Sequence, residues 1–116
     1  MKKLSLVLLF SCVVFSGVTV AQYVGPGATY KTSLAAILDN PVDDELVKLQ
    51  GYLVKKVSSD KYIFTDGSAE IRVEIDTDVF PAQAFDENDV IEIMGEAEKD
   101  FLQSPEIDVD RITLVK

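Results

Sequence analysis

The sequence predicts a mainly β protein, a small closed barrel of five strands that follows a short N-terminal helix. Apolar and polar residues alternate with a period of two along several segments, as in strands that bury one face. Two of these segments contain an interior glycine, Gly51 and Gly95, which is typical of strands that bend sharply. Five bent strands favour closure, because an open sheet would leave long unpaired edges.

The N-terminal segment 1–21 is predicted to be a cleavable secretory signal peptide. It begins with two lysines, continues as an apolar run, and has small residues at Thr19 and Ala21 before the expected cut. A transmembrane anchor is one alternative, because the apolar run approaches spanning length. A lipoprotein signal acylated at Cys12 is another, although Phe10 is bulky for that site. Cleavage after Ala21 fits the small residues best.

Cleavage would leave a single domain, residues 22–116, in the periplasm. Loss of the two N-terminal lysines would change the formal charge from −9 to −11. So acidic a surface repels nucleic acid and anionic membranes, and we therefore expect neither nucleic acid as a partner nor stable membrane insertion. The single cysteine would leave with the signal, so an apolar core rather than disulfides must stabilise the domain.

A short helix is expected after the Gly- and Pro-rich lead-in 22–30. Thr32 or Ser33 can cap it, and Asn40-Pro41 should end it, because a residue before proline avoids the helical region. Its apolar face should plug one end of the core. That face comprises Leu34, Ile37 and Leu38.

The first three strands are predicted within residues 47–76. The first begins at Val47 and contains Gly51, where a bulge or tight bend would let one strand pair with two neighbours. The second and third, around Tyr62–Phe64 and 71–75, should form a hairpin about the turn formers at 66–68.

Two more strands are predicted after segment 77–89, which has no sustained period. Residues 90–98 alternate regularly, and 101–105 form a loop before the last strand, 106–115. The apolar parity of this last strand changes between Val109 and Ile112. We therefore expect a bulge near Asp110-Arg111.

Taken together, these segments resemble the bacterial OB-fold (BOF) family of YgiW/YdeI-type stress-tolerance proteins. The matching pieces are QYVGP at 22–26, VxLxGYL at 47–53, YxFxD at 62–66, IxVxID at 71–76, GEAEKDF at 95–101 and EIDVxxI at 106–112. The resemblance implies a five-stranded Greek-key OB barrel in the periplasm. It also implies a role in tolerance of peroxide, metal ions, acid or cationic peptides, and no established enzyme activity.

The side chains available for catalysis are few. The chain has no histidine, and its one cysteine lies in the predicted signal peptide. The usual imidazole bases, thiol nucleophiles and zinc, haem or iron–sulfur ligands are therefore missing from the domain. No phosphate-binding loop is present either. We predict a non-enzymatic binding or adaptor module without a cofactor, whose partner is an envelope protein or a small ligand.

Carboxylates dominate the remaining chemistry, and weak divalent-cation binding is one alternative function. Alternate residues of a strand point the same way, and converging oxygens bind hard cations such as calcium. The candidate cation ligands are Asp76, Asp78, Glu96, Glu98, Asp108 and Asp110. These acids can equally form the solvated outer face of a barrel, and segment 76–87 lacks the spacing of an EF-hand loop.

An OB barrel binds ligands on the face of its second and third strands, between two flanking loops. The candidate ligand-binding residues on that face are Tyr52, Lys61, Ile63, Arg72 and Glu74, with 58–60 and 101–105 at its rims. Tyr52 can instead pack on its strand neighbours, and Arg72 can form a cross-strand salt bridge.

Cell-wall oligosaccharide is a second alternative ligand, because OB barrels can bind sugars. This hypothesis requires an exposed aromatic ring that can stack on a sugar. The candidates are Tyr52, Phe80 and Phe101.

Overall fold

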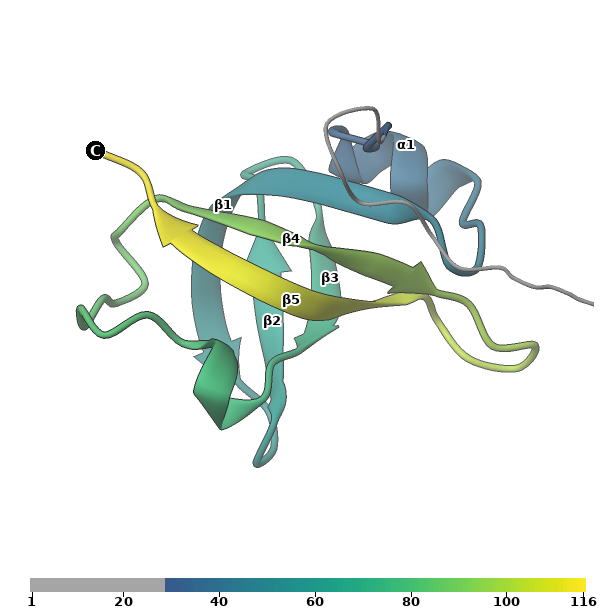
Figure 1. Cartoon of the computed structure of the whole chain (residues 1–116). Helices are drawn as coiled ribbons and strands as arrows, with labels where there is room; N and C mark the ends of the chain where they lie inside the picture. Colours follow the sequence, from purple (N-terminus) through teal and green to yellow (C-terminus); the bar gives the residue numbers. More distant parts are fainter. Residues whose placement is uncertain (1–28) are drawn as a thin grey trace, which may run out of the picture.

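The computed structural model describes residues 29–116, which form a closed five-stranded barrel with one short helix (Figure 1). The elements are α1 (Leu34–Asp39), β1 (Leu46–Lys56), β2 (Lys61–Thr65), β3 (Glu70–Glu74), the 3₁₀ turn η1 (Thr77–Val79), β4 (Ile91–Glu98) and β5 (Glu106–Leu114). Around the barrel the order is β1-β2-β3-β5-β4, and only the β3–β5 pair is parallel. The predicted five-stranded barrel with a short helix is confirmed. The predicted signal peptide lies outside the described residues.

Helix α1 has the predicted cap and the predicted buried face. The Ser33 hydroxyl accepts a hydrogen bond from the backbone N–H of Ala36 at 3.2 Å, which satisfies one donor of the first turn. Leu34 and Ile37 are fully buried, and Leu38 packs against the same core. The helix therefore covers one side of the barrel core (Figure 1).

The core consists of the inward-facing residues of every strand together with α1. Along β4 the alternation is complete, with every second residue buried. The buried apolar residues are Leu34, Ile37, Val47, Leu49, Phe64, Ile71, Val73, Ile75, Ile91, Ile93, Ala97, Ile107, Val109 and Ile112. Within residues 29–116 no polar or charged residue is buried, so the core is held by apolar packing alone.

Strand β1 pairs with two neighbours, as Gly51 predicts. Up to Gly51 it pairs with β4, and from Tyr52 onward it pairs with β2. The expected bulge lies three residues later, at Val54, where the register shifts. Only glycine fits at position 51, because a Cβ there would overlap the carbonyl oxygen of Thr65 and lie 2.9 Å from Cζ of Phe64.

The bulge predicted near Asp110-Arg111 is confirmed. Met94 of β4 pairs with Arg111 and the next residue, Gly95, pairs with Val109, which leaves Asp110 as the additional residue in β5. The bulge explains why the buried parity of β5 changes after Val109.

The close approach at Gly51 predicts a large loss of stability for Gly51→Ala. The new methyl group would displace the Thr65 backbone, and we expect the free energy of unfolding to fall by about 3 kcal/mol. Gly67→Ala is the matched control, because Gly67 has a φ of 95° but open space around it, and it should cost about 1 to 2 kcal/mol. Urea unfolding followed by circular dichroism measures both. Equal losses would contradict the steric role of Gly51.

Candidate functional site

The outer face of β2, β3 and β5 carries a network of opposite charges centred on Lys61. Its Nζ donates a hydrogen bond to Oε1 of Glu106 at 2.7 Å and lies 3.7 Å from Oε1 of Glu74. Nη1 of Arg72 lies 3.4 Å from the other carboxylate oxygen of Glu106. The strand pairing produces this arrangement, because Lys61 is opposite Glu74 and Arg72 is opposite Glu106.

Three of the five predicted ligand-binding residues, Lys61, Arg72 and Glu74, therefore lie together, and a fourth, Ile63, pairs with Arg72. Tyr52 does not join them, because it pairs with Thr65 at the other end of β2. Glu106 completes the network, although it is not among the candidate residues predicted from the sequence. Its position follows from the parallel β3–β5 pairing, which local periodicity does not reveal. Ligand binding by this face stays a prediction.

A hollow of about 360 Å³ adjoins Arg72 on this face. Its lining residues are Leu38, Ile63, Glu70, Ile71, Arg72, Ser104 and Pro105. The last two belong to the predicted rim 101–105, which is the loop between β4 and β5. At the tip of that loop, Phe101 and Leu102 are 95% and 87% exposed. The rim thus presents apolar side chains to solvent next to a charged face.

Two groups of three carboxylates lie around the same network. Within each group, oxygens of all three side chains lie within 4.8 Å of one another. The groups are Asp60 with Glu74 and Asp76, and Glu74 with Glu98 and Glu106. Of the six predicted cation ligands, Asp76 and Glu98 fall in these groups, whereas Asp78, Glu96, Asp108 and Asp110 fall in neither. Asp60 was missed because it lies in a turn, beyond the reach of strand periodicity.

Carboxylates on and beside this face repel one another, and Lys61 offsets part of that repulsion at Glu98 and Asp108. Partial burial raises the pKa of Glu96, Glu98 and Asp108, and repulsion from neighbouring carboxylates raises it further. The pKa of Lys61 is raised chiefly by its hydrogen bond to Glu106, which keeps the ammonium charged. The face can therefore hold positive groups or bind ligands that carry charges of both signs.

Comparison with known proteins gives one family and relatives in several bacteria. Residues 16–114 match the family described as Bacterial OB fold (BOF) protein. The chain is 37% identical to the calcium-regulated OB-fold protein CarO of Pseudomonas aeruginosa, with all of both chains covered. It is 41% identical to protein YgiW of Escherichia coli over 73 residues, 63% of this chain and 55% of that protein.

The solved structure of the hypothetical protein ygiW from E. coli has the same architecture. It matches with a TM-score of 0.69 and 36% identity, covering 82% of this chain and 99% of that one. None of the helices in residues 29–116 has the length and apolar character needed to span a membrane.

The raised pKa of Glu98 predicts that Glu98→Gln stabilises the protein at pH 7 and weakens its response to acid. Because the pKa is higher in the folded than in the unfolded state, the folded state binds the proton first as pH falls. Stability should therefore rise as pH falls through the folded pKa, and the gain is complete below the unfolded value of about 4.3. Glutamine carries no charge at any pH.

Melting temperatures between pH 8 and pH 4 measure this effect. Glu92→Gln is the control, because Glu92 is also on β4 but lies at its other end, opposite Thr113. If Glu98→Gln lowers the melting temperature at pH 7, or leaves its dependence on pH unchanged, the electrostatic interpretation of this face is wrong.

Proposed function

The chain belongs to the bacterial OB-fold (BOF) family, and from this premise we propose that it is a non-enzymatic binding module of the bacterial periplasm. It contributes to tolerance of envelope stress by binding cell-wall oligosaccharide on the outer face of β2 and β3. The observation that carries this proposal is Phe101, which is 95% exposed on the β4–β5 loop, and the same loop lines the hollow beside Arg72 through Ser104 and Pro105.

An exposed phenylalanine at a loop tip does not serve the folding of its own domain. Burying such a side chain would stabilise the protein by about 2 kcal/mol, and Phe101 forgoes this gain. A free aromatic ring can stack on the apolar face of a sugar, as the oligosaccharide hypothesis requires. Arg72, whose side chain is 51% exposed, and the carboxylates beside it can hydrogen-bond to hydroxyl and carboxyl groups of the same ligand.

A non-enzymatic role is supported by the state of the side chains at the site. The chain has no histidine to act as a general base, and the lysine of the network, Lys61, is held by carboxylates. Its pKa is raised by Glu106, so it stays protonated and cannot accept a proton near neutral pH. The periplasmic location is supported by the predicted signal peptide.

This function is tested by titrating soluble peptidoglycan fragments into isotope-labelled protein that lacks residues 1–21. Amide NMR shifts are recorded during the titration. We expect shifts confined to β2, β3 and the loop 101–105. Phe101→Ala and Arg72→Ala should each weaken binding about tenfold, as for central residues of a binding site. Arg111→Ala is the control, because Arg111 is an exposed arginine of β5 outside the hollow. Absence of shifts at millimolar fragment, or shifts elsewhere, would overturn the proposed site.

A second candidate function is the binding of a divalent cation by the acids around Lys61. It is favoured by the two groups of carboxylates whose oxygens lie within 4.8 Å. Calcium takes six to eight oxygen ligands, and carboxylates are among its preferred ones. A relative named as calcium-regulated supports a link to this ion. Lys61 opposes the binding, since its ammonium already compensates Glu74 and Glu106.

Lys61→Met is therefore expected to tighten calcium binding about tenfold, because it removes a positive charge a few ångströms from the ion. Isothermal titration calorimetry and the shift of melting temperature at millimolar calcium measure this change. Lys31→Met is the matched control, since Lys31 pairs with Glu45 at 3.4 Å and takes no part in the Lys61 network. If neither wild type nor Lys61→Met gives heat or a melting shift, the cation function is wrong.

A further inference from the structure

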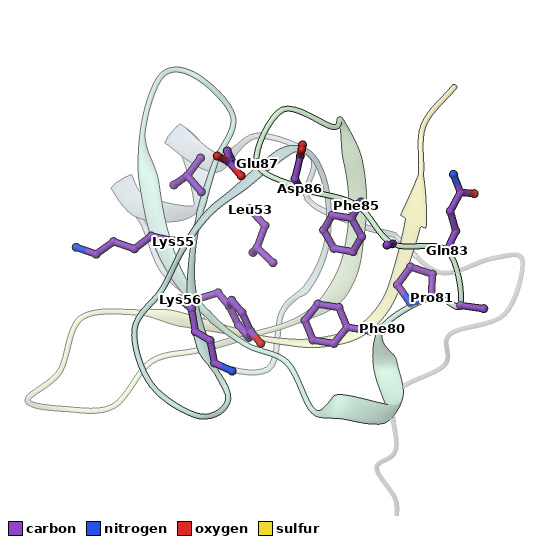
Figure 2. A pocket seen from close by; sticks show the side chains of 13 residues that line it. Leu53, Lys55, Lys56, Phe80, Pro81, Gln83, Phe85, Asp86 and Glu87 are labelled. Atoms are coloured by element: carbon purple, nitrogen blue, oxygen red, sulfur yellow. The ribbon is translucent and has the colours of Figure 1, made fainter.

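A second and larger hollow, of about 590 Å³, is lined by the end of β1, by Tyr62 and by the connection after η1 (Figure 2). This connection lies across the barrel from α1 (Figure 1). Figure 2 shows Leu53, Phe80 and Phe85 around one mouth of the barrel, with their side chains directed toward its centre. Tyr62 of β2 completes this apolar wall. The volume falls in the range of small-molecule sites, which is about 300 to 1,000 Å³. None of its lining residues belongs to the hollow beside Arg72.

The wall of this hollow is a row of aromatic rings in mutual contact. Tyr62 and Phe80 meet edge to face with centroids 5.6 Å apart, and Phe80 stacks on Phe85 at 6.0 Å. All three residues are only partly buried, although they pack against the core. The rings are held by their contacts with one another, so a flat apolar ligand would meet a preformed surface.

The aromatic wall is accessible to a ligand because β1 exchanges β4 for β2 as its partner strand. Beyond Gly51, β1 pairs with β2 and no longer with β4, so the connection after η1 borders this end of β1 instead of a strand. Phe80 and Phe85 are both in that connection. One side of the hollow is thus formed by side chains of an irregular connection and not by those of a strand.

The ammonium group of Lys56 lies above the row of aromatic rings. Nζ of Lys56 lies 5.6 Å from the ring centroid of Tyr62, and within residues 29–116 it makes no ion pair. Lys55 also lines the hollow, but Figure 2 shows its side chain directed away from it. On the far rim, Asp86 and Glu87 also line the hollow, and the carboxylate of Asp86 accepts a hydrogen bond from the backbone N–H of Asn88 at 2.8 Å. An anionic group of a ligand therefore has to lie on the Lys56 side, away from these two carboxylates.

We propose that this hollow binds a small aromatic carboxylate. The ring of the ligand packs against Tyr62, Phe80 and Phe85, and its carboxylate pairs with the ammonium of Lys56. Both the ring and the carboxylate of the ligand contribute to binding, because the three aromatic rings are part-exposed without it and Lys56 makes no ion pair within residues 29–116. This site is separate from the face proposed for oligosaccharide, so either site can fail its test without the other.

Three probes that share one ring system test the proposal: 2-naphthoate, the neutral 2-naphthalenemethanol and the cationic 2-naphthylmethylamine. Each is titrated into the purified protein while amide NMR shifts are recorded. We expect shifts at Leu53, Tyr62 and the connection 80–87, with the carboxylate bound about three- to fivefold more tightly than the neutral probe. The amine should bind more weakly than both.

Two neighbouring lysines provide the matched variants. Lys56→Gln should reduce the affinity for 2-naphthoate to that of the neutral probe, whereas Lys55→Gln should leave it unchanged. Both positions are exposed, so neither substitution threatens folding. The proposal is overturned if 2-naphthoate causes no shifts at millimolar concentration, if the three probes bind equally, if the amine binds most tightly, or if the two variants behave alike.

Discussion

Closure of the barrel depends on two places where backbones approach too closely for any side chain. At Gly51 the space of a Cβ is taken by the carbonyl group of Thr65, and at Gly95 by the carbonyl group of Asp108. Gly51 lies where β1 leaves β4 and joins β2, and Gly95 lies beside the bulge of β5. Without these contacts the curled strands could not meet, and the apolar faces would lose their common core.

The charged face follows from that closure. Lys61, Glu74 and Glu106 are distant in sequence, and they meet because β3 lies between β2 and β5 in the closed sheet. Glu98 joins them because β4 pairs it directly with Glu106. Each strand of the barrel directs its apolar residues inward and the alternate residues outward. Where neighbouring strands are rich in acids, their outward-facing carboxylates therefore lie close together. The positive charge of Lys61 offsets the repulsion among these carboxylates.

Periodicity predicted the parts of the fold in which burial alternates. The bulge of β5 was predictable because it reverses the buried parity between Val109 and Ile112. The bulge of β1 was not located, because Val54 lies in the exposed end of the strand, where a change of parity leaves no apolar signal. Phe80 and Phe85 were expected in a segment without a period, and their contacts are with each other and with β2. Such contacts depend on the closed barrel and not on local sequence.

The two hollows differ in what a charged ligand would have to displace. At the first, every basic group already has a carboxylate partner, and Arg72 at 3.4 Å from Glu106 is held less closely than Lys61 at 2.7 Å. A ligand there exchanges one ion pair for another, so shape and stacking must supply most of its affinity. At the second, Lys56 lies over the ring of Tyr62 and makes no ion pair within residues 29–116, so an anion there would not have to break one. This difference underlies the two ligands proposed above, a sugar at the first hollow and an aromatic anion at the second.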